Sequence, residues 1–186
     1  MGPVIETERL VLRPPILEDF DAWARFYEDG DALKYIGGAQ VRSVAWRTFT
    51  AAAGGWMLQG YALFSVLEKS SGRWIGRVGA HYPEGWPGTE VGWAIDRSVW
   101  GKGYAHEAAS ASIDFAFDTL GWTEVIHCID PANQASRNLA ERLGSTILRQ
   151  AMMPPPVTSG EIDVWGQSRE QWRGGARDLP RRSMSL

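Results

Sequence analysis

Two glycines separated by one residue stand at the start of the clearest helical pattern in the sequence. Gly101 and Gly103 lie between an apolar segment at residues 90–96 and a helix expected over about 104–120. The first turn of a helix leaves main-chain N–H groups unpaired and carries the positive end of the helix dipole. Glycines let an anion approach these groups, and Lys102 adds a positive charge. The segment predicts a diphosphate-binding turn, although a tight strand-to-helix turn alone would also need the glycines.

The known phosphate-binding motifs do not match this segment. A P-loop would need glycine at position 96, where Asp96 stands, and serine or threonine at position 103, where Gly103 stands. The dinucleotide fingerprint would need glycine or alanine three residues after Gly103, at His106. A nucleotide-phosphate enzyme with magnesium-dependent ATP binding is therefore a remote alternative.

Metal chemistry is not expected either. The pair His106-Glu107 begins a pattern typical of zinc-protease helices, but the second histidine of that pattern is missing. The single cysteine, Cys128, excludes an intrachain disulfide and a site with several thiolates. It also lacks a sequence neighbour that would activate it as a nucleophile.

The elements around the turn predict an α+β protein in which strands and helices share one mixed sheet. Periodicity of two indicates strands, and periodicity near 3.6 indicates helices. Turn residues at 68–72 join two of the strands in an antiparallel hairpin. The expected strands are 10–12, 61–67, 74–81, 90–96, 125–129 and 162–166, and the expected helices are 17–27, 43–59 capped by Ser43, 104–120 and 134–143.

Length and composition bound the remaining possibilities. The chain has 186 residues, of which 44% are hydrophobic and 22% charged, as in ordinary globular domains. We expect one domain over residues 1–173 and a mobile tail over 174–186. The net charge of −3 argues against nucleic acid as a main partner. Neither a signal peptide nor an apolar run long enough to span a membrane is visible, so we expect a cytoplasmic protein without a membrane partner.

A resemblance to a known family rests on these same segments. Gly101-Lys102-Gly103-Tyr104-Ala105, preceded by residues 90–95 and followed by 133–144, resembles the GNAT N-acetyltransferase superfamily. Within it, the pattern is most similar to the branch of ribosomal-protein-alanine acetyltransferases. The opening residues 7–14 and the closing residues 165–172 are similar to the same branch. The resemblance covers about residues 6–173.

The resemblance implies a splayed mixed sheet of about six to seven strands flanked by about four helices. It implies that acetyl-coenzyme A binds between the fourth and fifth strands, without a metal. Main-chain amides from Trp100 to Ala105 would hold the diphosphate, and main-chain groups at Ile95 and Arg97 would pair with the pantetheine arm. Carried over by position, the cofactor-binding residues are Ile95, Arg97, Trp100, Gly101, Lys102, Gly103, Tyr104, Ala105, Asn133 and Ser136.

The sequence departs from the family pattern at three places that matter for chemistry. Many relatives carry a tyrosine, four residues before the glycine at 144, that protonates the leaving thiolate, but this chain has Ala140. Ser98 stands where glutamine or arginine is frequent, and Ser145 where an aromatic residue is common. Ser136 or a water molecule would then have to supply the proton to the thiolate.

Acetyl transfer requires a neutral amine, so a base or a desolvating pocket is needed. A free lysine amine has a pKa of about 10.4, far above physiological pH. Glu90, at the start of the strand beside the expected thioester, is the candidate base, and its alternative is a solvent-facing carboxylate. His81 is a second candidate because imidazole titrates near neutral pH. Trp86, in the loop over 83–88, is expected to line the acceptor pocket with His81.

These observations predict an N-acetyltransferase that uses acetyl-coenzyme A and a primary amine in a ternary complex. The alternative is a non-catalytic acyl-coenzyme A-binding or regulatory module, which the residues Ser98 and Ala140 make credible. The acceptor is left open between a protein N-terminus and a small-molecule amine, and a homodimer is left as one option for assembly.

Overall fold

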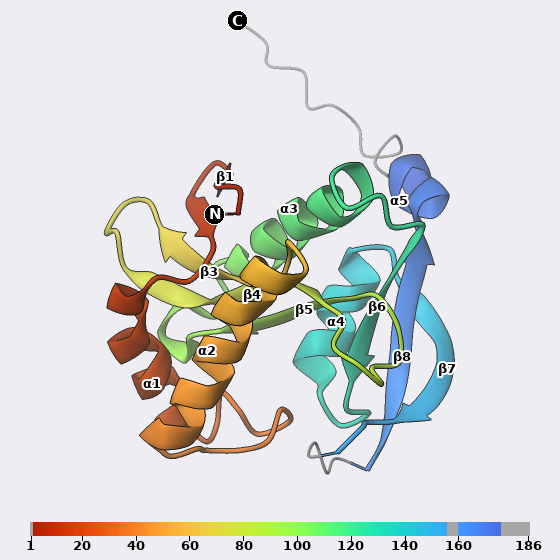
Figure 1. The fold of residues 1–186 in the computed structure, drawn as a ribbon. Helices are drawn as coiled ribbons and strands as arrows, with labels where there is room; N and C mark the ends of the chain where they lie inside the picture. Colours follow the sequence, from red (N-terminus) through yellow and green to blue (C-terminus); the bar gives the residue numbers. More distant parts are fainter. Residues whose placement is uncertain (1, 156–159, 176–186) are drawn as a thin grey trace, which may run out of the picture.

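The computed structural model describes residues 2–155 and 160–175, and its centre is an eight-stranded sheet (Figure 1). The strands lie in the order β1-β2-β3-β4-β5-β6-β8-β7. Their bounds are Ile5–Glu6 (β1), Leu10–Arg13 (β2), Leu63–Glu68 (β3), Trp74–His81 (β4), Glu90–Ile95 (β5), Glu124–Ile129 (β6), Thr146–Met152 (β7) and Glu161–Ser168 (β8). The helices are Phe20–Glu28 (α1), Arg42–Leu58 (α2), Tyr104–Asp118 (α3), Gln134–Arg142 (α4) and Arg169–Gly175 (α5).

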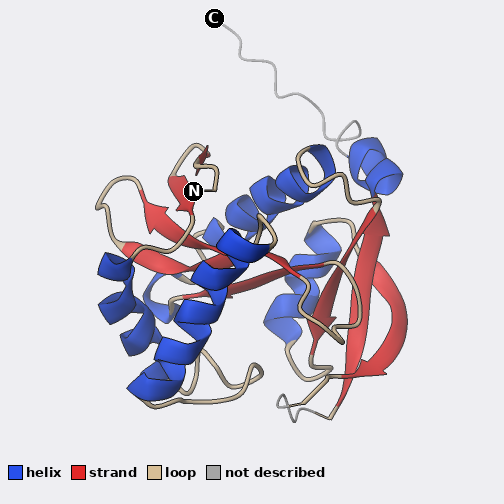
Figure 2. Ribbon diagram, viewed as in Figure 1, coloured by secondary structure: helices blue, strands red, loops and turns tan. Residues whose placement is uncertain are grey.

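The sheet consists of two halves that meet at β5 and β6. Strands β1 to β5 pair with their neighbours in antiparallel order, as do β6, β8 and β7. The junction between β5 and β6 is parallel. In Figure 2 the strands of the two halves run at a steep angle to each other. The mixed sheet expected from the sequence is therefore confirmed.

Alternation along the strands divides the core between the two faces. Val91 and Ile95 of β5 belong to the cluster that packs against α3, through residues such as Ile113. Ala94 belongs instead to the cluster formed with α1 and α2, which includes Trp23. Side chains that are two residues apart on a strand point to the same face. Glu90 and Gly92 therefore share the α1/α2 face with Ala94.

The sequence underestimates the number of elements. Over residues 2–155 and 160–175 there are eight strands rather than six or seven, and five α-helices rather than four. Strand β7 has almost no buried residues, so no apolar alternation marks it, and it exists because it pairs with β8. The two-residue strand β1 likewise exists because it pairs with a neighbour, β2. Helix α5 ends at Gly175, two residues into the expected tail, and residues 176–186 of that tail lie outside the described residues.

One helix boundary is also wrong. Helix α2 begins at Arg42, and the residue before it, Val41, makes no side-chain cap. Ser43 therefore lies inside the first turn and is not the N-cap. The helix continues through Gly54 and Gly55 to Leu58, because its apolar residues pack against α1 and β3.

Candidate active site

Strands β5 and β6 touch at their starts and then separate. Within the described residues they pair at one register position, Glu90 with Ile126. The amide of Asp96 donates to β4, so the even-numbered residues of β5 bond that neighbour and the odd-numbered ones face β6. Beyond Val91, the main-chain N–H and C=O groups of Trp93 and Ile95 face β6 but have no strand partner there. A linear ligand can pair with this exposed edge.

Side chains from β5, β6 and α4 meet at the opening. The indole Nε1 of Trp93 donates to Ser136 Oγ at 3.2 Å. The Nδ1 of His127 lies 2.7 Å from the carbonyl oxygen of Val91, and its Nε2 lies 3.1 Å from Ser145 Oγ. Burial lowers the pKa of His127 to about 4, so the ring is neutral and donates from Nδ1. His127 is thus a hydrogen-bonded core residue.

The glycine turn has the conformation that its residues suggest. Gly101 and Gly103 have φ of 75° and 81°, which favours glycine, and Gly103 is the N-cap of α3. A Cβ on Gly101 would meet no atom within 4 Å, so the space before the turn is open. The amides of residues 101–103 donate to none of the described residues. They can therefore bind an anion.

Three residues of the expected cofactor set are engaged within the chain. The amide of Trp100 donates to the carbonyl of Arg97 at 3.2 Å. The indole of Trp100 donates to the carbonyl of Ile95 at 2.8 Å. The Trp100 amide is therefore occupied within the chain, whereas each of the two carbonyls keeps a second acceptor site. The 3-10 turn Arg97–Val99 causes these contacts, because it folds the chain back on itself.

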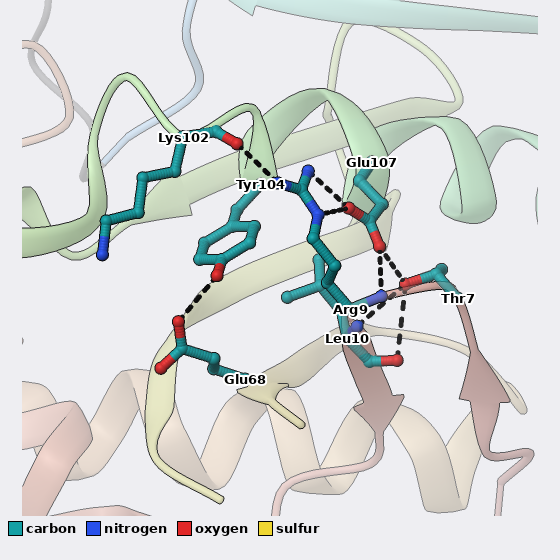
Figure 3. A network of polar contacts seen from close by, with 7 residues as sticks. All are labelled: Thr7, Arg9, Leu10, Glu68, Lys102, Tyr104 and Glu107. Carbon is teal, nitrogen blue, oxygen red and sulfur yellow. Dashed lines mark hydrogen bonds and ion pairs between the residues drawn. The ribbon is translucent and has the colours of Figure 1, made fainter. Parts of the chain in front are cut away.

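A polar network fixes the glycine turn to the first strands of the sheet (Figure 3). Arg9 donates from Nε to Glu107 of α3 at 2.6 Å, and from a terminal nitrogen to the carbonyl of Lys102 at 2.8 Å. Glu107 also accepts from the main chain of Arg9 and from Thr7. Tyr104 lies under the Arg9 guanidinium, 4.6 Å from ring centre to Cζ. Arg9 lies in the opening segment 7–14, and no local pattern in the sequence signals its contact with Glu107, 98 positions away.

The rest of the predicted cofactor residues are placed around this turn. Figure 3 shows the side chain of Lys102 extended away from the network. An open groove of about 640 Å³ lies next to Gly103, between the β1–β2 connection, α3 and Arg142 of α4. Asn133 is the N-cap of α4, and its Oδ1 accepts from the amide of Ser136 at 3.1 Å. The side-chain oxygen of Asn133 is therefore already engaged in capping α4.

Glu90 is a buried carboxyl group at the point where β5 and β6 separate. Its side chain is 6% exposed, which excludes the alternative of a solvent-facing carboxylate. Oε1 accepts from the amide of Cys128 at 2.9 Å, and Oε2 accepts from the indole of Trp86 at 2.5 Å. Burial raises the pKa of Glu90 to about 7, against these two hydrogen bonds, which lower it. A carboxyl group with this pKa can exchange protons at neutral pH.

His81 and Trp86 lie next to Glu90, as a shared pocket requires. His81 is directly opposite Glu90 in the β4–β5 register. Its ring meets the ring of Trp86 edge-on, with centroids 4.7 Å apart. Burial, with a smaller contribution from the charge of Arg77, lowers the pKa of His81 to about 4. His81 is therefore neutral at neutral pH.

Cys128 lies against Glu90 from the β6 side and is half-buried. Burial first, and then the neighbouring carboxyl, raise the pKa of its thiol. The thiolate is the nucleophilic form of cysteine, so this environment disfavours a covalent intermediate on Cys128.

Over residues 2–155 and 160–175, no cluster of three or more histidine, cysteine or acidic side chains could hold a metal ion. In the same part of the chain, no helix has the length and apolarity needed to cross a bilayer.

Comparisons with known proteins agree with this geometry. The family model described as an acetyltransferase (GNAT) domain matches residues 9–146. The chain is 31% identical over 140 residues to an uncharacterized N-acetyltransferase, p20, of Bacillus licheniformis, with 74% of this chain and 79% of the relative covered.

Solved structures share the whole fold. An acetyltransferase from Agrobacterium tumefaciens superimposes with a TM-score of 0.82 and 30% identity, covering 91% of this chain and 96% of that one. A putative ribosomal-protein-serine acetyltransferase from Vibrio cholerae gives a TM-score of 0.74 at 22% identity, over 90% and 99% of the two chains, which shows a common fold. The family match, the relatives and the splayed sheet together establish that the chain belongs to the GNAT family of N-acetyltransferases.

Proposed function

We propose that the protein transfers the acetyl group of acetyl-coenzyme A to a primary amine by direct attack in a ternary complex. The observation that carries this proposal is Glu90, a carboxyl group with a pKa of about 7 at the mouth of the β5–β6 opening. Its position and pKa suit a base that deprotonates an amine beside the thioester.

The cofactor would lie along the opening. The free amides of residues 101–103 would bind the diphosphate at the start of α3, and the main-chain groups of Trp93 and the amide of Ile95, which have no strand partner, would pair with the pantetheine arm. The groove beside Gly103 has room for the nucleotide end. A main-chain N–H of the same β5 edge would donate to the thioester oxygen as negative charge develops there.

The protein would move two protons in the reaction. Glu90 in its carboxylate form accepts a proton from the amine, directly or through a water molecule, and the amine nitrogen bonds to the acyl carbon. The carbon–sulfur bond then breaks and the thiolate takes a proton. Ser136 is suited to pass it on, because Ser136 Oγ accepts its hydrogen bond from Trp93 and so keeps its own proton available. Solvent water would replace the proton that Ser136 gives, and Glu90 would release to solvent the proton taken from the amine.

The alternative is a module that binds acyl-coenzyme A without turnover. Ala140, which is buried and carries no hydroxyl group, is the observation that favours it. Calorimetry with acetyl-coenzyme A, followed by thiol release over a panel of amines, separates the two. Binding with thiol release that Glu90→Gln abolishes agrees with the enzyme, whereas binding without turnover on any amine agrees with the module. Absence of binding at millimolar concentration contradicts both.

A further inference from the structure

Arg77 is a cation without an ionic partner among the described residues, on the α1/α2 face of the sheet. Among the described residues, no carboxylate lies within ion-pair distance of it. Its Nε is buried and makes no hydrogen bond. Burying an unpaired polar group of a charged side chain is costly, so such a group calls for an explanation. The contacts of the guanidinium with aromatic rings do not supply a hydrogen-bond acceptor for Nε.

Its place in the sheet puts Arg77 on the same side as the proposed base. Arg77 is opposite Ala94 on β5, and Glu90 lies four residues before Ala94 on the same strand. The guanidinium also lies beside the stacked rings of Trp23 and Tyr27 of α1, with Cζ 5.8 and 5.6 Å from the two centroids. Both contacts locate Arg77 on the α1/α2 face, which carries the Glu90 side chain.

The carboxylate of Asp19, which is bound to the register partner of Arg77, is already paired. Ser65 of β3 is opposite Arg77 in the register, and its hydroxyl donates to Asp19. Asp19 also receives two hydrogen bonds of 2.7 Å from the guanidinium of Arg13. Because Arg13 and Ser65 already hold Asp19, Arg77 has no carboxylate of its own. Its positive charge acts on Glu90 and His81 and lowers the pKa of each.

Two glycines lie between the two charged groups, and of these Gly92 has the more open surroundings, because a Cβ on Gly79 would meet Phe64 and the Ala62 carbonyl at 3.0 Å. Gly79 and Gly92 are opposite each other in the register, between the Arg77–Ala94 pair and the His81–Glu90 pair. A Cβ on Gly92 would have Glu90 as its nearest neighbour, at 3.6 Å from Oε1. A small molecule lying over these glycines would meet a carboxyl base at one end and a guanidinium at the other.

We propose that Arg77 binds a carboxylate of the acceptor, so that the acceptor is an amine carrying a carboxylate several bonds from its nitrogen. The inference rests on the proposed function and adds the substrate class. A guanidinium matches a carboxylate in geometry and in charge, whereas a phosphate monoester would bring excess negative charge next to Glu90. The four-residue offset along the strand corresponds to about 13 Å between Cα positions. That spacing favours an ω-amino acid or a peptide with an acidic second residue over an α-amino acid.

The test compares acids with their amides. Wild type, Arg77→Met, Arg77→Lys and the control Arg42→Gln are assayed with three matched pairs: 4-aminobutyrate and its amide, 6-aminohexanoate and its amide, and Ala-Glu-amide and Ala-Gln-amide. Arg42 is a suitable control because it is exposed and already paired with Asp21. Melting temperature and the KM for acetyl-coenzyme A are measured for each variant.

We expect wild type to prefer the acid of at least one pair by about 10- to 100-fold in kcat/KM, the range for one charge-assisted hydrogen bond. The preference should disappear in Arg77→Met, be partly kept in Arg77→Lys, and persist in Arg42→Gln. A structural role for Arg77 would lower both members of a pair equally. Equal rates for acid and amide in wild type, or an acid preference that survives in Arg77→Met, would overturn the proposal.

A binding measurement covers the case in which none of the six amines is acetylated. Glutarate is titrated into the protein with coenzyme A present, and binding is followed by calorimetry. Binding to wild type that is at least about tenfold tighter than to Arg77→Met keeps the proposal. Equal binding, or none, overturns it. Thiol release with any other amine decides the proposed function separately, so the two failures can be distinguished.

Discussion

The indole Nε1 of Trp86 donates a hydrogen bond of 2.5 Å to Oε2 of Glu90, four residues further along the chain. The loop before β5 thereby returns to cover the first residue of that strand. The main chain of Cys128 on β6 donates to the other carboxylate oxygen. Glu90 is therefore held from both sides of the junction where the two halves of the sheet separate. Its protonation can be tested in several ways.

The rate should follow the titration of Glu90. A base acts in its deprotonated form, so kcat/KM should rise with pH through an apparent pKa of about 7. Glu90→Gln should remove this limb and lower kcat by about 100-fold or more. The pH–rate profile of both proteins, with a fixed amine, checks this. If the rise in the pH–rate profile is unchanged in Glu90→Gln, the titrating group is the amine and not Glu90.

Stability should report the same pKa without any substrate. The pKa of Glu90 is raised from 4.5 to about 7 in the folded state, so the folded protein holds this proton more tightly than the unfolded chain does. The resulting stabilisation is complete below pH 4.5 and is lost as pH rises through 7. The free energy of unfolding of wild type, relative to Glu90→Gln, should therefore fall by about 3 kcal/mol across this window. Urea denaturation at pH 4.5 and 8 measures the difference, and parallel curves would contradict the raised pKa.

Removing the Trp86 donor should shift the titration. A hydrogen bond to a carboxylate favours its charged form, so Trp86→Phe should raise the pKa of Glu90 further. The limb of the pH–rate profile should move to higher pH by up to about one unit. Phenylalanine keeps an aromatic ring beside His81, so the substitution removes the hydrogen bond while retaining most of the packing. A limb that stays in place would show that the Trp86 contact is absent in the working enzyme.

A methyl group beside Glu90 should obstruct the acceptor. Gly92→Ala places a Cβ at ordinary contact distance from the Glu90 carboxyl, where the amine must approach. We expect the KM for the amine to rise about tenfold, since misplacement near the reacting atoms is costly, with the melting temperature unchanged or higher. Gly54→Ala on α2, where a Cβ meets nothing within 4 Å, is the matched control. Equal effects of the two substitutions would contradict the placement of the acceptor.

The network at Arg9 should govern cofactor binding. Arg9→Lys and Glu107→Gln each weaken the contacts that hold the Lys102 carbonyl, so the glycine turn loses its support. The KM for acetyl-coenzyme A should rise about five- to tenfold, the effect of losing one hydrogen bond, while the pH limb near 7 stays. Arg173→Gln is the control, because it breaks an exposed ion pair with Asp118 at the other end of α3. A cofactor KM that is unchanged in both variants would contradict this role.

Local patterns in the sequence determined most of the fold. The largely apolar segment at 74–81, which follows a turn, gives β4 with the expected bounds. The helical stripe after Gly103 gives α3, because apolar periodicity sets which face of a helix is buried. The conformation of Gly101 and Gly103 could also be read, since a left-handed turn favours glycine. Strand β7 could not be predicted, because its exposed residues carry no pattern and its strand form depends on pairing with β8.

The site itself was decided by tertiary structure. In the sequence, Glu90 is one carboxylate among many, and no motif marks Arg77. The fold buries Glu90 and leaves Arg77 without an ionic partner among the described residues. Arg9 and Glu107 meet across 98 positions of the chain. Local sequence determines which helices and strands form. The pKa of a side chain such as Glu90 depends instead on its burial and on neighbours that come from distant elements. Such proximity exists only after the two halves of the sheet have packed.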